Sequence, residues 1–139
     1  MQMDWLRLIK AFGVAALCIF FTDWYFFGRP SLHGPYQRFP GVWRKYADKS
    51  DEIRSIVYGT AFAFAVSAIF LIVCGWLNIH SITDAVLLGA AFWLAGPCAL
   101  LLSYKLVMNL DRTIILNHGL GWLARFMASA VAYGLLARG

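Results

Sequence analysis

The stretch IILNHGLGWLARFMASAVAYGLL, residues 114–136, determines how the rest of the chain is interpreted. As an α-helix it would be about 34 Å long, enough to cross a hydrocarbon core of about 30 Å. Most of its side chains are apolar, yet Arg125 stands near the middle, where an unpaired charge costs at least about 2.5–3.5 kcal/mol. We therefore expect this segment to span a membrane and Arg125 to have a partner within the protein.

The composition extends this interpretation to the whole chain. Of its 139 residues, 61% are hydrophobic and only 14% are charged, more apolar surface than a soluble domain of this size could bury. The backbone of a segment in lipid must satisfy its own hydrogen bonds, and the alternating strands of a membrane barrel are missing from the sequence. We predict an all-α integral membrane protein, a four-helix transmembrane bundle forming a single domain over 1–139. The spans are expected at about 5–27, 53–77, 85–107 and 114–136.

Local signals indicate where two spans begin and where one is interrupted. Ser50, followed by two acidic residues, is a candidate N-cap of the second span, and Ser81 in the sequence SITD is one for the third. Pro97 interrupts the third span and leaves the carbonyl of Trp93 without its helical donor. Broken membrane helices can line binding sites, although kinks without a site are commoner.

The connection 28–52 between the first two spans is rich in proline, glycine and basic residues. We expect it to lie on the membrane surface, with the lipid bilayer and its anionic headgroups as partners. The chain lacks the clustered basic face of a nucleic-acid binder, so no nucleic-acid partner is predicted. Eight of the twelve Lys and Arg residues fall in this loop region and the 105–112 connection, which favours both termini on the outer side. Arg7 and Lys10 oppose that orientation.

Small residues recur every four positions in the second and fourth spans, a spacing that lets helices approach closely. They are Gly59, Ala63 and Ser67, and Ala124, Ala128 and Ala132. We expect them to pack inside the bundle, and a homodimer interface is the alternative.

The polar residues of the fourth span fall on one helical face, because His118, Trp122, Arg125 and Ser129 lie within about 60° of one another. We expect this polar face to meet the protein and the opposite face to meet lipid. The residues of that opposite face are Leu120, Leu123, Phe126, Met127 and Val131.

Asp23 is the best candidate partner for Arg125. It lies near the loop-side end of the first span, at a depth that the arginine side chain can reach. Asp84 belongs to the opposite interface and would leave a gap of about 10 Å. One hypothesis is a structural ion pair that fixes helix register, and the other is a substrate or ion site at the loop side. The residues of that candidate binding site are Asp23, Tyr104, Asn117, His118, Trp122 and Arg125.

No cofactor, metal site or catalytic residue is predicted. The three cysteines are isolated within apolar runs, and His118 is the only histidine inside a span, so a pair of haem ligands at one depth is not expected. Motifs for hydrolytic or phosphate chemistry are missing from the sequence. An enzyme is therefore a weaker hypothesis than a binding protein.

Three short motifs resemble one family. They are TDWYFFGRP (22–30), LLGAAFWLAG (87–96) and IILNHGLGWL (114–123). Together they are similar to the small bacterial four-helix membrane family catalogued as domain of unknown function 1761. The matching residues are Trp24, Tyr25 and Gly28, then Gly89 and Trp93, then Asn117 and Gly119.

The resemblance implies a four-helix membrane fold and residence in a bacterial cytoplasmic membrane, with the termini on the periplasmic side according to the charge count. It implies no activity, and Arg125 and Pro97 are not features of the family. The sequence thus leaves three functional hypotheses: a protein that binds or translocates a small molecule or ion, a non-catalytic accessory subunit of a larger membrane complex, and a membrane enzyme acting on a lipid or apolar substrate.

Overall fold

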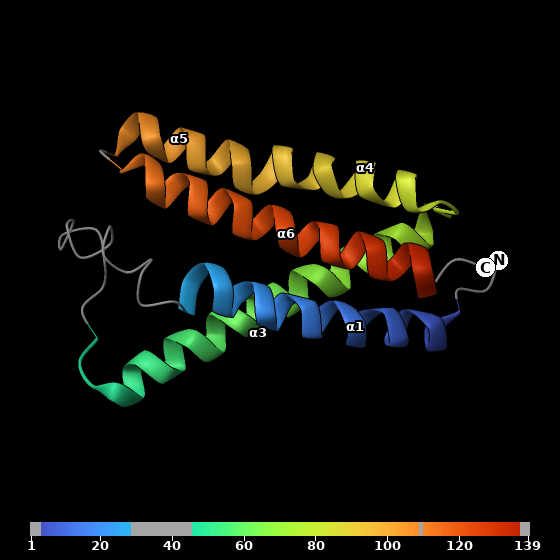
Figure 1. The fold of residues 1–139 in the computed structure, drawn as a ribbon, viewed down its shortest axis with the longest axis horizontal. Helices are drawn as coiled ribbons and strands as arrows, with labels where there is room; N and C mark the ends of the chain where they lie inside the picture. Colours follow the sequence, from blue (N-terminus) through green and yellow to red (C-terminus); the bar gives the residue numbers. More distant parts are fainter. Residues whose placement is uncertain (1–3, 29–45, 109, 137–139) are drawn as a thin grey trace.

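The computed structural model describes residues 4–28, 46–108 and 110–136, and these ranges form four long apolar helices (Figure 1). The spans are Trp5–Phe27, Lys49–Trp76, Ile82–Val107 and Arg112–Leu136, each long and apolar enough to cross a membrane. The prediction of an all-α four-helix membrane bundle is therefore confirmed. Most of the basic connection, residues 29–45, lies outside the described residues, and so does its predicted contact with headgroups.

The first and third spans each contain a π-helical turn. The first span consists of α1 (Trp5–Asp23) followed by η1 (Trp24–Gly28), and the second span is the single helix α3 (Lys49–Trp76). The third consists of α4 (Ile82–Trp93), η2 (Leu94–Cys98) and α5 (Ala99–Val107), and the fourth is α6 (Arg112–Leu136). The predicted interruption at Pro97 is present as η2, because the ring cannot donate to the preceding turn and the helix widens around it.

The helix starts follow the chemistry of their caps. Ser81 caps α4, accepting from the backbone N–H of Asp84 at 2.9 Å and donating to its carboxylate, as predicted. The prediction for α3 is wrong, since the cap is Asp48 rather than Ser50. The Asp48 carboxylate accepts from the N–H of Asp51 at 2.8 Å, so the helix begins earlier and Ser50 lies in its first turn.

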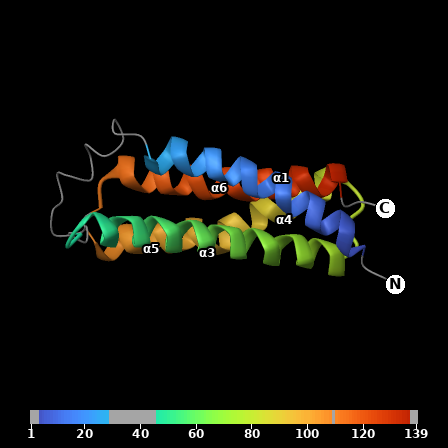
Figure 2. The same cartoon turned by 90° about the horizontal axis from the view of Figure 1, so that it is seen from below.

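Helix α6 is the centre of the bundle. It packs along α1 on one side and along α4 on another, and α3 crosses both α1 and α6 (Figures 1 and 2). The start of α1 and the end of α6 lie at the same end of the bundle, as four spans require (Figure 1). The buried core therefore draws on all four spans. Its residues are Leu8, Ala11, Phe70, Leu71, Cys74, Ala85, Phe126, Ala130 and Tyr133.

Because α6 is central, the prediction that one whole face of this helix meets lipid is wrong for some of its residues. Leu120 and Val131 are exposed as predicted, but Phe126 is only 5% exposed and packs against Phe70 and Phe92. Met127 meets Gly89 of α4, where an added Cβ would lie 3.2 Å from the Met127 Cε. Because α4 covers the face that hydrophobic periodicity assigned to lipid, only a narrow strip of α6 is left uncovered.

The first half of α3 separates from the bundle, and the separation is visible in Figure 1. Ala63 and Ser67 are buried against the other helices, as predicted for small residues. The same prediction is wrong for Gly59, which is exposed and has no atom within 4 Å of an added Cβ. Ala132 of α6 is buried, while Ala124 and Ala128 are half-buried. The close approach of α3 to the other helices thus ends at Ala63. The alternative expectation for the small residues, a homodimer interface, stays a prediction.

Candidate functional site

The predicted ion pair between Asp23 and Arg125 is present. Nε of Arg125 donates to Oδ1 of Asp23 at 2.7 Å, and the two side chains are 11% and 16% exposed. Asp23 is the last residue of α1, and Arg125 lies in the middle of α6. The arginine side chain therefore extends towards the loop-side end of the first span, which lowers the cost of a charge at mid-membrane depth.

Two aromatic rings hold the guanidinium. Its central carbon lies 4.4 Å from the centroid of the Trp122 ring and 5.0 Å from that of Phe27. A cation over an aromatic face is stabilised by the negative ring face, and the effect grows when water is excluded. His118 in turn packs against Phe27, with the ring centroids 4.9 Å apart. The plane of the guanidinium is thus fixed by contacts with η1 and α6.

Phe27 can reach α6 because Gly121 has no side chain. A Cβ at Gly121 would lie 2.7 Å from Cζ of Phe27, a separation that van der Waals repulsion forbids. Asn117 secures the same junction, since its Nδ2 donates to the carbonyl of Phe26 at 2.6 Å. Sequence reasoning identified Asn117 as a candidate, but Phe27 and Gly121 were missed. A glycine one turn before the arginine on the same helix was the available signal.

Part of the guanidinium has no acceptor among the described residues. A carboxylate on the Nε edge satisfies at most two of the five N–H groups of arginine. The described residues offer no further acceptor for the remaining Nη protons, and none of these nitrogens is both fully buried and unbonded. The remaining Nη donors therefore have no acceptor within the described part of the protein.

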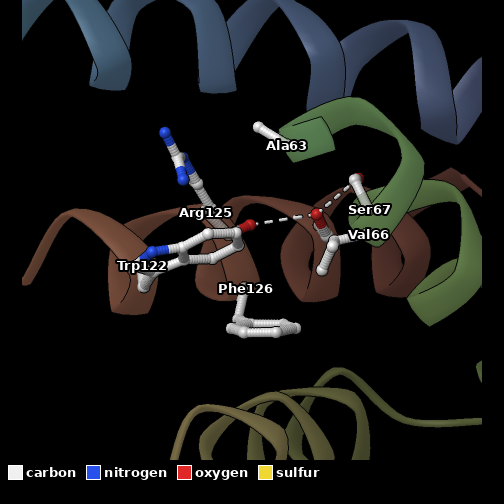
Figure 3. A pocket seen from close by; sticks show the side chains of 7 residues that line it. Ala63, Val66, Ser67, Trp122, Arg125 and Phe126 are labelled. Carbon is white, nitrogen blue, oxygen red and sulfur yellow. Dashed lines mark hydrogen bonds between the residues drawn. The ribbon is translucent and has the colours of Figure 1, made fainter. Parts of the chain in front are cut away.

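Arg125 also lines a cleft between α3 and α6 with about 170 Å³ of empty volume, too narrow to enclose a water molecule (Figure 3). It is lined by Ala63, Val66, Ser67, Trp122, Arg125, Phe126 and Ser129. The Arg125 side chain projects away from α6 towards α1 (Figure 3), where Asp23 accepts from its Nε. The cleft lies where the small residues of α3 stop contacting the bundle, so movement of the first half of α3 would widen it.

Two of the residues that line the cleft are serines, Ser67 of α3 and Ser129 of α6. The Ser129 hydroxyl donates its proton to the carbonyl of Arg125 at 2.9 Å, so Ser67 must donate in the 2.7 Å bond between the two hydroxyls. This chain of hydrogen bonds ties α3 to α6 directly below Arg125. It is a structural crosslink, because neither hydroxyl has a proton left to offer a ligand in the cleft.

Of the predicted site residues, Tyr104 remains to be placed. Tyr104 lies on α5, is 42% exposed and, within the described ranges, forms no side-chain hydrogen bond or ring contact with the other candidate residues. Trp93, not predicted as a site residue, donates from Nε1 to the carbonyl of Gly119 at 2.8 Å and anchors the end of α4 to α6. Over the described ranges, no group of three or more His, Cys, Asp or Glu side chains is placed to hold a metal ion.

No family model, curated protein or solved structure matches the chain. The resemblance to the family of domain of unknown function 1761 therefore stays a prediction.

Proposed function

We propose that this membrane protein binds an anionic group, a phosphate or a carboxylate, at the loop-side end of the bundle through Arg125. The observation that carries the proposal is that only the Nε edge of the Arg125 guanidinium has an acceptor among the described residues. Asp23 engages one edge, two aromatic rings fix its plane, and the remaining N–H donors have no acceptor among the described residues, while Arg125 also lines a narrow cleft. Such a fixed fork of donors matches the oxygens of a phosphate or carboxylate.

The depth of the site supports this proposal. Asp23 lies five residues before Gly28, the end of η1, which corresponds to about 7.5 Å along the helix axis. The guanidinium that pairs with it is therefore within reach of the headgroup layer, although the arginine Cα is near mid-membrane. Binding is favoured over translocation because the serine crosslink and the aromatic core close the bundle below the cleft.

The proposal predicts that anions stabilise the purified protein through Arg125. Replacing chloride by inorganic phosphate or acetate at constant ionic strength should raise the melting temperature in detergent, because a ligand of the folded state stabilises it by mass action. Arg125→Lys keeps a charge for Asp23 but loses the planar fork, so the increase should disappear. Lys105→Gln removes an exposed cation of α5 and should leave the increase unchanged.

An equal response of the wild type, Arg125→Lys and Lys105→Gln would contradict the proposal, since it would mark a non-specific salt effect. Absence of any increase in the wild type would contradict it as well.

We also propose that the protein resides in a bacterial cytoplasmic membrane with its termini on the periplasmic side, which the asymmetric distribution of Lys and Arg supports. In a background without native cysteines, His80→Cys and Lys49→Cys place thiols at exposed positions on opposite ends of the bundle. An impermeant maleimide applied to spheroplasts should label position 80 and should label position 49 only after permeabilisation. The reverse pattern would invert the orientation, and labelling of both from one side would refute the four-span topology.

A further inference from the structure

The first half of α3 leaves a lateral opening into the bundle. Beyond Ala63, towards the loop, the apolar side chains of α3 have no neighbours that bury them. Those exposed are Ile53, Ile56, Val57, Tyr58 and Phe62. Gly59 lies one turn before Ala63, on the face of α3 that lines the cleft, and nothing is within 4 Å of where its Cβ would be. An occupant of the cleft could therefore enter sideways, from the lipid phase.

The charges at this end of the bundle favour an anionic occupant. The loop region 28–54 and the connection 105–112 hold eight of the twelve Lys and Arg residues but only four of the seven acidic residues. Such an excess of positive charge concentrates anionic lipids in the adjacent leaflet. A soluble anion would have to leave water to reach the guanidinium, whereas a lipid phosphate is already held near that depth.

We propose that the anionic group bound by Arg125 is the headgroup phosphate of a lipid of the loop-side leaflet, which enters beneath the first half of α3. This inference rests on the proposed function and names its ligand class. The phosphate oxygens accept from the Nη donors that Asp23 leaves free, and the apolar face of α3 around Ile56 and Gly59 covers the lipid chains. The first half of α3 moves to admit the headgroup, since the cleft is too narrow when empty.

The structure offers a matched pair of variants that tests the route of entry. Gly59→Leu fills the opening without a clash, because an added Cβ there meets no atom within 4 Å. Gly13→Leu adds the same side chain to α1, where an added Cβ also meets no atom within 4 Å and the residue is exposed. Both variants should fold, so a difference between them in lipid binding reports on the opening.

Native mass spectrometry in a mild detergent, with phosphatidylglycerol or diacylglycerol of the same acyl chains added, measures the binding. The wild type and Gly13→Leu should retain phosphatidylglycerol about tenfold more strongly than diacylglycerol, which lacks the phosphate, because tenfold is the factor expected for one charge-assisted hydrogen bond. Gly59→Leu and Arg125→Lys should lose that preference, while Gly59→Leu should still respond to inorganic phosphate in the melting experiment.

Two results would overturn the inference in distinguishable ways. If Gly59→Leu retained phosphatidylglycerol as the wild type does, lateral entry of a lipid would be refuted while the anion site itself could stand. If Arg125→Lys changed neither lipid retention nor the response to inorganic phosphate, the proposed function would fail together with the inference.

Discussion

Removing either partner of the Asp23–Arg125 pair is expected to destabilise the protein by about 3–5 kcal/mol, the usual loss when a buried ion pair is broken. Arg125→Leu leaves the Asp23 carboxylate at 16% exposure without its cation, and Asp23→Asn leaves the guanidinium with a neutral acceptor only. Asp23→Asn should lose less stability than Arg125→Leu, because the amide oxygen of asparagine can still accept from Nε and the two aromatic rings still hold the cation.

The double variant Asp23→Asn/Arg125→Leu should recover part of the loss, and this non-additivity measures the contact directly. Unfolding free energies of the wild type, the two single variants and the double variant, determined in one detergent, complete the cycle. The exposed pair Asp4–Arg7, 2.9 Å apart, is the control. The same cycle with Asp4→Asn and Arg7→Leu should show a coupling below about 1 kcal/mol, as surface pairs do.

The cycle also separates a structural role of the pair from a binding role. If Arg125 serves only to fix helix register, the double variant should regain stability and keep its response to inorganic phosphate. If Arg125 forms the anion site, stability should return in part and the response should not. Simple additivity of the two single effects would contradict the contact seen between Asp23 and Arg125.

The membrane explains why so much of the fold was predictable. Lipid requires long apolar helices with internally satisfied backbones, so four apolar runs predict four helices. The same requirement makes a charge at mid-span conspicuous and demands a partner for it. Asp23 was identifiable because helical rise converts sequence position into depth, and only a carboxylate near the loop-side end of the first span matched the reach of Arg125.

What the sequence did not predict depends on which helices are neighbours. Phe126 was assigned to lipid because one polar face and one apolar face suggest one buried side, yet α6 is covered by α1 and by α4. Gly59 was assigned to a helix contact by spacing alone, but α3 diverges from the bundle before reaching it. Tyr104 shares the loop-side depth of the other candidates, yet it is 42% exposed and forms no side-chain hydrogen bond or ring contact with them in the described ranges, because depth does not specify position around the bundle axis.

The contact between Gly134 and Ile82 closes the opposite end of the bundle and should be the most sensitive packing site. A Cβ at Gly134 would lie 2.5 Å from Cγ1 of Ile82 and 2.9 Å from its Cα. A side-chain atom alone could rotate away, but the Cα belongs to the first residue of α4. The capping bonds between Ser81 and Asp84 hold that backbone in place.

Gly134→Ala should therefore destabilise the protein by about 1–3 kcal/mol, the typical cost of overpacking a tight helix contact. Intrinsic helix propensity acts in the opposite direction, since alanine is favoured over glycine within a helix by about 1 kcal/mol. Gly13→Ala isolates that second effect, because an added Cβ at Gly13 meets no atom within 4 Å. Thermal unfolding in detergent should show Gly13→Ala at or above the wild-type melting temperature and Gly134→Ala clearly below it. Equal melting temperatures for the two variants would mean that α4 and α6 do not approach closely at Gly134, because only a backbone contact there distinguishes the two substitutions.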